Sequence, residues 1–322
     1  MTKQARQRTY LILKTAILLA CAVWLSAAPA TARQIIGGND ANADNWPGIA
    51  SLQSIQGSAL FHECGATMIS DTWALTAAHC VEAARVDTAG RAVQYIPDAD
   101  GNLVRFGPLI LVIGNSDLRR MAAGSVFPVN RIEMHPDYQP GRPEAGSDIA
   151  LLRISGQWEG PVATLQALPG ADEDESEFYV AGYGNREEDS MGERAVSRTG
   201  RHLSAPSMRL SEGRVPPVSN ALCRAQIQRL IHAYGLEESH AGVTVNAASQ
   251  ICAGDGFIDS CQGDSGGPLV RYGHTGQPVQ VGLVSWGLGC GRAESPGIYT
   301  RISAFSDWIR TTVDEPGASQ LP

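Results

Sequence analysis

Short runs of β-branched and aromatic residues, separated by Gly, Pro and Asn, recur along most of this chain of 322 residues. Such spacing is typical of an all-β sandwich or barrel, since a parallel α/β fold would place a helical pattern between successive strands. The chain contains 35 Gly and 18 Pro, so turn-forming residues interrupt it throughout, which excludes a coiled coil or a mostly disordered chain. The runs that we predict to be strands are residues 48–55, 66–69, 109–113, 148–154, 178–181, 279–286 and 297–302.

Two segments instead have the spacing of apolar residues that is typical of a helix. Residues 220–234 begin at Asn220, a residue type that caps helices, and end before Gly235. Residues 303–313 place four apolar side chains on one face: Phe305, Trp308, Ile309 and Val313. Three further stretches resist assignment to strands, and we expect long loops at residues 82–108, 186–217 and 236–248.

The first 32 residues have the pattern of a secretory signal peptide. Residues 1–14 carry four cations, residues 15–28 are apolar, and two small-residue cleavage sequences end at Ala30 and Ala32. The apolar run is shorter than the roughly 20 residues that a membrane-spanning helix needs. We therefore predict a secreted or periplasmic protein without membrane attachment once the signal peptide is removed. A lipid on Cys21 is the alternative, because the sequence LLAC that ends there is similar to a bacterial lipoprotein motif.

Charge and cysteine content narrow the possible partners. The formal net charge is −8 and no lysine follows Lys14, so we expect no nucleic-acid partner.

The chain has seven cysteines, and six remain once Cys21 is removed with the signal peptide. An even number of cysteines in an exported chain indicates disulfides, but spacing alone leaves the pairing open. None of these cysteines has C-x-x-C spacing or a nearby histidine cluster, so we expect no metal ion and no cofactor. The six cysteines that remain without Cys21 are Cys64, Cys80, Cys223, Cys252, Cys261 and Cys290.

Four short motifs carry candidate chemistry. In chain order they read IIGG at 35–38, TAAHC at 76–80, DIAL at 148–151 and DSCQGDSGGP at 259–268. A serine hydroxyl is a poor nucleophile at neutral pH unless a base takes its proton during attack, and His79 is the predicted base for Ser265. A buried carboxylate must hold the other imidazole nitrogen, and Asp148 precedes an apolar strand that would bury it. Each motif alone is a weak signal, since a lone histidine is usually structural.

Together and in this order, the four motifs resemble the secreted trypsin-like serine proteases of the chymotrypsin family. The resemblance covers residues 35 to about 313, and the long loops are its departures. It implies an all-β fold of two packed six-stranded Greek-key β-barrels, at about 50–160 and 161–302, with a C-terminal helix at about 303–313. We expect the protease domain, residues 35–322, to be a monomer.

The resemblance also implies the catalytic groups. His79, Asp148 and Ser265 would form a catalytic triad that acts through an acyl-enzyme intermediate. The N–H groups of Gly263 and Ser265 would form the oxyanion hole. The disulfides of the family would here join Cys64 to Cys80, Cys223 to Cys252, and Cys261 to Cys290.

The same resemblance predicts the substrate preference, because it assigns certain residues to the substrate pocket. Asp259 would lie at the base of the primary substrate pocket, where a buried carboxylate demands a cationic partner. We therefore expect a serine endopeptidase that cleaves after Arg or Lys. The remaining pocket residues would be Ser260, Ser285, Trp286, Gly287 and Gly297.

Activation in this family frees the amino group of the first isoleucine of the IIGG motif. The new ammonium of Ile35 would pair with Asp264, the residue before the nucleophile. Related precursors commonly carry Arg or Lys before the cut, whereas here Gln34 precedes Ile35 and Arg33 lies one position earlier. We therefore expect residues 33–34 to be a short propeptide, removed as a dipeptide or by another protease that cleaves after Gln34. Expected partners are protein or peptide substrates, this activating protease and a protein inhibitor.

Two other functions compete with this prediction. A non-catalytic binding protein on the same fold is the first, although such proteins usually lose a triad residue and all three are present here. An all-β adhesion or carbohydrate-binding module is the second, and it would leave the ordered motifs unexplained.

Overall fold

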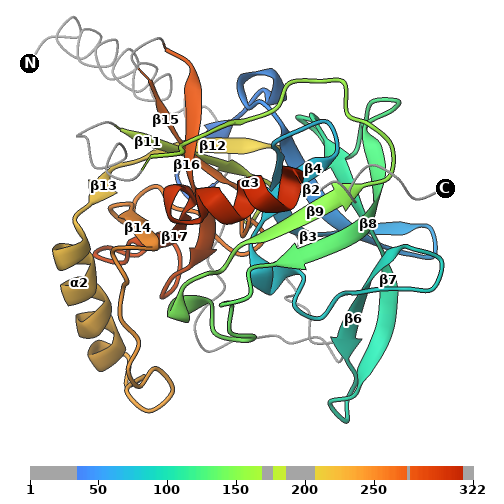
Figure 1. The fold of residues 1–322 in the computed structure, drawn as a ribbon. Helices are drawn as coiled ribbons and strands as arrows, with labels where there is room; N and C mark the ends of the chain where they lie inside the picture. Colours follow the sequence, from blue (N-terminus) through green and yellow to red (C-terminus); the bar gives the residue numbers. More distant parts are fainter. Residues whose placement is uncertain (1–34, 169–176, 186–206, 274–275, 315–322) are drawn as a thin grey trace, which may run out of the picture. The chain divides into compact units, whose positions relative to one another are not determined.

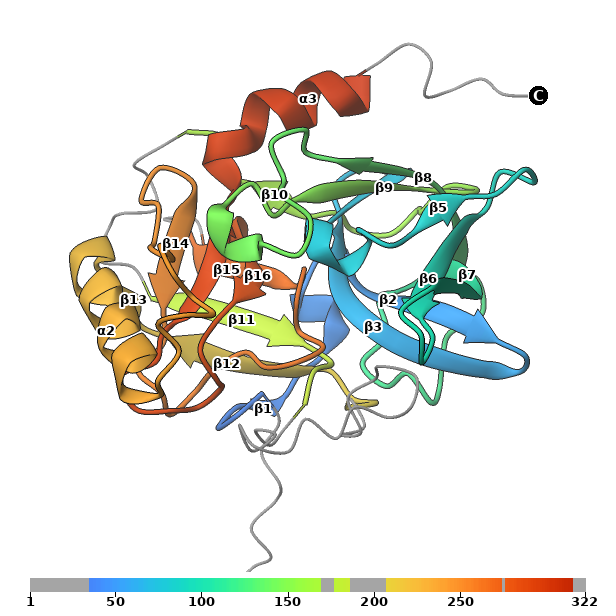
Figure 2. The same ribbon diagram turned by 90° about the horizontal axis from the view of Figure 1, so that it is seen from below.

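Two curled β-sheets make up most of the computed structural model, which describes residues 35–168, 177–185, 207–273 and 276–314. In Figures 1 and 2 the first sheet, in blue to green, lies beside the second, in yellow-green to red. The expected all-β fold of two barrel-like sheets with a C-terminal helix is confirmed. The predicted signal peptide and propeptide, residues 1–34, lie outside the described residues. Among the described residues, no helix has the length and apolar character needed to cross a membrane.

The first sheet closes on itself because its last large strand pairs with its first. Along β7, Leu109 and Leu111 fill the barrel interior, whereas Ile110 and Val112 pack toward the second sheet. Successive side chains of a strand point to opposite faces, so a strand that is buried on both faces is apolar throughout. The antiparallel ring consists, in order, of β2 (Ile49–Gln56), β3 (Ala59–Met68), β4 (Trp73–Thr76), β9 (Ala150–Ile154), β8 (Val126–Met134) and β7 (Leu103–Ile113).

The second sheet follows the same plan but stays open. Its central path is β12 (Ser211–Val215), β11 (Phe178–Gly182), β15 (Pro268–Tyr272), β16 (Pro278–Trp286), β17 (Gly297–Arg301) and β14 (Gln250–Ala253). Short strands extend both ends, since β1 (Asn39–Asp40) pairs with β12 and β13 (Pro217–Val218) pairs with β14. The two-residue strand β10 (Thr164–Leu165) runs parallel to β16. Of the two expected barrels, therefore, only the first is closed by backbone pairing within the described residues.

The C-terminal helix fastens the two sheets together. A short 3₁₀ turn, η4 (Ile302–Phe305), leads into α3 (Ser306–Asp314), within a residue of the predicted bounds. Phe305 and Ile309 are buried in one cluster with Trp73 of the first sheet and Leu283 of the second. Each such large apolar side chain contributes about 1.5–3 kcal/mol to folding stability when it leaves water. The packing of α3 against both sheets therefore stabilises their association.

The other helix starts where it was predicted, but its N-cap lies one residue earlier than expected. The N-cap of α2 (Asn220–Ala233) is Ser219, whose hydroxyl accepts a hydrogen bond from the Leu222 N–H at 3.3 Å, so the assignment of Asn220 as the cap was wrong. Serine and asparagine cap helices about equally well, so their order in the sequence alone did not decide between them. The buried face of α2 consists of Cys223, Ile227 and Ile231.

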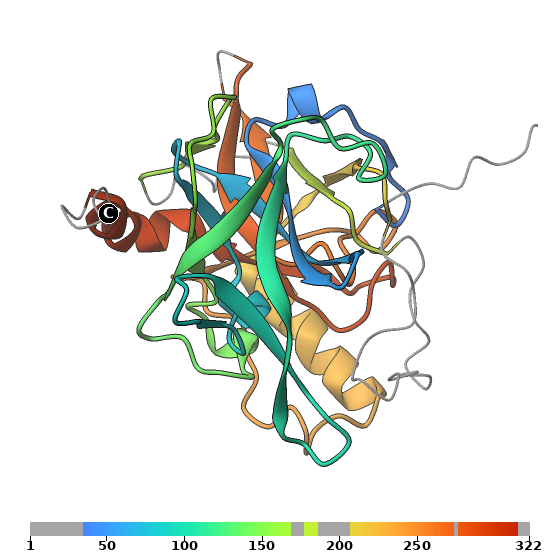
Figure 3. The same ribbon diagram turned by 90° about the vertical axis from the view of Figure 1, so that its right-hand side faces the viewer.

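One expected loop is largely a hairpin. Residues 82–108 contain β5 (Arg85–Val86), β6 (Ala92–Pro97) and the start of β7, and β6 pairs with β7 in a hairpin that extends from the barrel (Figure 3). Exposed polar residues interrupt the apolar alternation there, which hid these strands. The expected loop at 186–217 likewise contains β12, with residues 186–206 outside the described part of the chain. Residues 236–248 contain no strand, as expected. Strands β4, β8, β14 and β15 had no counterpart among the predicted runs.

Candidate active site

His79 and Asp148 lie at the same end of one strand pair. Strands β4 and β9 are antiparallel, and Thr76 at the end of β4 pairs with Ala150 at the start of β9. The chain that leaves β4 and the chain that enters β9 therefore meet. His79 lies in the 3₁₀ turn η2 (Ala78–Cys80) directly after β4, and Asp148 is two residues before β9.

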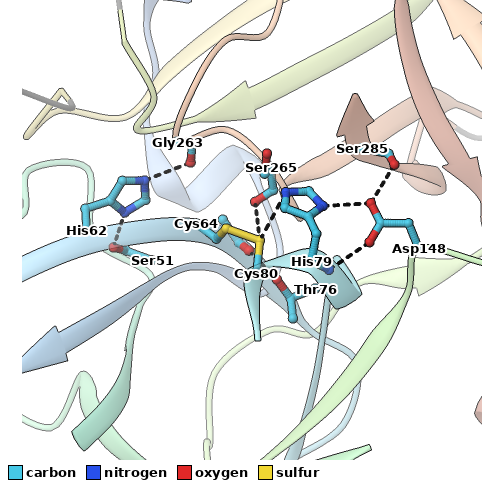
Figure 4. Close-up of a disulfide and its surroundings, with 11 residues drawn as sticks. Ser51, His62, Cys64, Thr76, His79, Cys80, Asp148, Gly263, Ser265 and Ser285 are labelled. Atoms are coloured by element: carbon cyan, nitrogen blue, oxygen red, sulfur yellow. Dashed lines mark hydrogen bonds and ion pairs between the residues drawn. A yellow bond between two sulfur atoms is a disulfide. The ribbon is translucent and has the colours of Figure 1, made fainter. Parts of the chain in front are cut away.

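The Asp148 carboxylate holds the His79 imidazole in one orientation (Figure 4). Asp148 is fully buried, and its Oδ2 lies 2.8 Å from His79 Nδ1. Its Oδ1 accepts the backbone N–H of His79 at 2.9 Å, and Ser285 Oγ donates to Oδ2 at 2.6 Å. Because an ionised carboxylate only accepts, Nδ1 carries a proton and Nε2 of the neutral ring is free to accept one. Ser285 was expected only as a pocket wall, so its bond to Asp148 is an addition.

Charge favours the protonated form of this histidine. Burial by itself lowers the pKa of His79, but the charge and hydrogen bond of Asp148, together with the charge of Glu82, outweigh it and raise the pKa above its ordinary value. Burial has the opposite effect on an acid and by itself raises the pKa of Asp148. The charge and hydrogen bond of His79 outweigh burial, so the pKa of Asp148 lies below its ordinary value. The pair is thus arranged to stabilise a positive imidazolium beside a negative carboxylate.

Ser265 approaches His79 from the second sheet. It lies in the turn before β15, and its carbonyl accepts the N–H of Gly65 in β3 at 2.8 Å, which ties the two sheets together at this point. The Cys80 sulfur lies 3.8 Å from His79 Nε2 and 3.7 Å from the Ser265 carbonyl oxygen. Figure 4 shows Ser265 beside the His79 ring on the side away from Asp148. The three residues expected to form the triad are therefore brought together from both halves of the chain.

A partly buried histidine that the sequence did not reveal contacts the turn at Gly263. His62 Nε2 lies 2.8 Å from the Gly263 carbonyl oxygen, and Ser51 Oγ lies 2.7 Å from His62 Nδ1. Burial lowers the pKa of His62 to about 4, so the ring is neutral at neutral pH, with Nε2–H donating to the carbonyl and Nδ1 accepting from Ser51. Gly263 has a φ of +94°, a conformation that favours glycine. This chain of bonds orients the Gly263 peptide; a lone histidine in a strand carried no local signal of it.

Asp264 is buried directly beneath this turn. Its Oδ1 accepts the Gly184 N–H at 2.7 Å, and its Oδ2 accepts the Cys261 N–H at 2.9 Å. Burial raises the pKa of Asp264 to about 6, which marks a carboxylate that costs free energy to ionise. Ile35 is also buried, within the core of the second sheet against Phe178 and Val180.

A cavity with a volume of about 150 Å³ lies beside Ser265, at the place expected for the substrate pocket. Asp259 is 2% exposed, and its Oδ2 accepts the Gly291 N–H at 3.0 Å. A side chain at Gly297 would place its Cβ 3.2 Å from Asp259 Oδ1, so glycine keeps this wall open. Burial raises the pKa of Tyr299, and the negative charge of Asp259 raises it further. The predicted pocket residues Ser260, Ser285, Trp286, Gly287 and Gly297 all line the cavity.

The three disulfides of the structure are the pairs that the resemblance implied: Cys64–Cys80, Cys223–Cys252 and Cys261–Cys290. Among the described residues, His79 and the first pair form a group whose ligand atoms converge as a metal site requires. Both sulfurs are bonded to each other, so the group offers no thiolate and does not suit a metal ion.

The fold and this arrangement define a serine protease of the chymotrypsin type. The family model described as Trypsin matches residues 35–309. The chain is 34% identical to a tryptase from Mus musculus over 93% of this chain and 96% of that protein. It is 32% identical to testisin from Homo sapiens, over 89% and 80% of the two chains, and 28% identical to chymotrypsin-like elastase family member 1 from Felis catus, over 88% and 91%. The chain belongs to the trypsin family of serine proteases.

Proposed function

We propose that this protein is an exported endopeptidase that cleaves after Arg or Lys, with His79, Asp148 and Ser265 as its catalytic triad. The observation that carries the proposal is the pairing of the buried Asp148 with His79 at 2.8 Å, beside Ser265 and a pocket with Asp259 at its base. Three disulfides support an oxidising, extracytoplasmic location.

Hydrolysis would proceed in two halves. His79 Nε2 takes the Ser265 proton as Oγ attacks the peptide carbonyl carbon, and the imidazolium then gives this proton to the leaving amine, which leaves an acyl-enzyme. In the second half, His79 takes a proton from water, the hydroxide attacks the ester, and the proton returns to Ser265. The N–H groups of Gly263 and Ser265 would stabilise the oxyanion of each tetrahedral intermediate. Asp148 stays ionised and stabilises each imidazolium.

Specificity would come from charge at the base of the pocket. A guanidinium or ammonium that enters the pocket is attracted by the buried Asp259 carboxylate, whereas an apolar side chain gains no such attraction. Gly297 keeps one wall clear for the long stem of Arg or Lys.

Cleavage before Ile35 would switch the enzyme on. In the uncut chain Ile35 has a φ of +43°, a strained value for a β-branched residue that costs about 1–3 kcal/mol. Removal of residue 34 abolishes this torsion angle and creates an ammonium at Ile35. The buried Asp264 would gain this cation as a partner, because the two donors described above are uncharged backbone N–H groups. Because Gln34 precedes the cut, an enzyme specific for Arg or Lys would need a second protease.

The test is the release of product from a panel of peptidyl amides that end in Arg, Lys, Phe or Ala. The protein must have a sequenced N-terminus, and Ser265→Ala serves as the control. Turnover of the Arg and Lys substrates that disappears in the variant supports the triad and the pocket together. No turnover by protein that begins at Ile35 would favour the alternative, a binding protein on the same fold.

A further inference from the structure

Glu82 links the turn that carries His79 to the loop that leads to Asp148. This residue lies three positions after His79 and is partly buried. Its Oε2 accepts the Tyr138 hydroxyl at 2.6 Å and the backbone N–H of Gly141 at 2.7 Å. Tyr138 is 8% exposed and belongs to the core of the first barrel. One carboxylate oxygen thus bridges both chain segments that deliver the His79–Asp148 pair.

The same carboxylate places a second negative charge near the imidazole. Burial and the hydrogen bond to Glu82 both raise the pKa of Tyr138, so this phenol stays neutral and does not add a charge of its own. The acidic groups that act on His79 are Asp148, before β9, and Glu82, after η2. The Arg85 guanidinium donates to the backbone carbonyls of Glu82 and Ala84, which places a cation close to Glu82. Ser265 and Ser285, which face the pair from the second sheet, are uncharged.

From this geometry we propose that Glu82 is a positioning residue for the hydrolysis described above. It holds the 138–141 segment against the histidine turn, and its charge favours the imidazolium that forms when Ser265 loses its proton. The inference rests on the proposed function only for its effect on rate. Its effect on the His79 ring exists whether or not the protein turns over a substrate.

Two substitutions separate the charge from the hydrogen bonds. Glu82→Gln keeps an oxygen acceptor for Tyr138 and Gly141 but removes the charge. Tyr138→Phe removes one hydrogen bond but keeps the charge. Glu133→Gln is a matched control, because it removes a carboxylate from β8 that pairs with Arg131 rather than with the site.

The primary measurement is the titration of the His79 ring by NMR in the Ser265→Ala background, which needs no turnover. We expect Glu82→Gln to lower the His79 pKa by about 0.3–0.6 unit, whereas Tyr138→Phe and Glu133→Gln leave it unchanged within about 0.1 unit. Glu82→Asp, which restores a charge, should recover part of the shift. An unchanged His79 pKa in a folded Glu82→Gln protein would overturn the electrostatic role.

Kinetics supply the second readout. In protein that begins at Ile35, the acid limb of the kcat/KM profile should move to lower pH in Glu82→Gln by the same amount as the NMR titration, and kcat at pH 8 should fall about two- to fivefold. Tyr138→Phe should lower kcat without moving the acid limb. If the parent enzyme is inactive, the proposed function fails while the NMR result still decides the role of Glu82. An acid limb that moves equally in Tyr138→Phe would contradict the separation of charge from position.

Discussion

The closed first barrel and the open second sheet contribute different parts of the site. The first barrel supplies His79 and Asp148 from adjoining ends of β4 and β9, two strands paired residue by residue within a complete ring. The second sheet supplies Ser265, the Gly263 turn and the Asp259 pocket from loops between strands, two of whose segments are joined by the Cys261–Cys290 disulfide. The proposed base and its carboxylate thus lie next to paired strands, whereas the proposed nucleophile and pocket lie in longer loops.

Removal of the nucleophile should have the largest effect. Ser265→Ala should reduce kcat/KM for an Arg amide by about 10⁴-fold or more, because the remaining groups cannot form the acyl-enzyme. Thermal unfolding should change by no more than about 2 °C, since this side chain is only partly buried. Residual activity above one per cent would show that another residue of the open half performs the chemistry.

The charge at the base of the pocket should have the next largest effect. Asp259→Ser should lower kcat/KM for Arg and Lys amides by about 100- to 1,000-fold while it changes the values for Phe and Ala amides little or raises them. The ratio of Arg to Phe turnover is the quantity to measure. A ratio that stays constant would place specificity elsewhere, outside the second sheet's pocket.

The ionisation of Asp264 should distinguish the precursor from the processed protein. Its pKa in the folded chain is about 6, above the ordinary value of 3.8, so the folded state binds more protons between these values. In protein that retains Arg33-Gln34, this group should therefore cost about 2 kcal/mol of stability as the pH rises from 4 to 7. In protein that begins at Ile35, the ammonium should reduce this loss.

Urea unfolding at four pH values, on both forms with disulfides intact, measures the difference. Asp264→Asn in the precursor should remove this component of the pH dependence. Identical pH profiles for the precursor and the processed protein would contradict a pairing of the new ammonium with Asp264.

The contact between the two halves at Gly263 should have a smaller effect than the changes at Ser265 and Asp259. His62→Phe removes the donor to the Gly263 carbonyl, and we expect kcat to fall about three- to tenfold with little change in KM, because a Gly263 residue that is less firmly held leaves its N–H, one proposed oxyanion donor, less well oriented. Ser51→Ala should have a smaller effect of the same kind. Steady-state kinetics on an Arg amide would measure the fall in kcat for both variants. A change in KM alone would indicate a role in substrate binding instead.

Local pattern accounts for much of the fold and for the residues that meet in the candidate site. The predicted runs at 48–55, 109–113 and 279–286 all lie in long strands, and the run at 109–113 is apolar on both faces. The runs that were missed have polar interruptions, as in β6, or are very short, as in β4. Their pairing with neighbouring strands, rather than their own composition, makes them strands.

By itself, the sequence determined the all-β class and the order of the four motifs, because these depend on residue type and nearby spacing. The resemblance that these motifs carry selected His79, Asp148, Ser265 and Asp259 as candidate site residues. Only the tertiary structure decided which distant groups assist them. Ser285 is 137 positions from the Asp148 carboxylate it contacts, and His62 is 201 positions from Gly263. Hydrogen bonds across such separations depend on how two sheets pack, and no local periodicity encodes that packing. The closure of the first barrel and the openness of the second were decided in the same way.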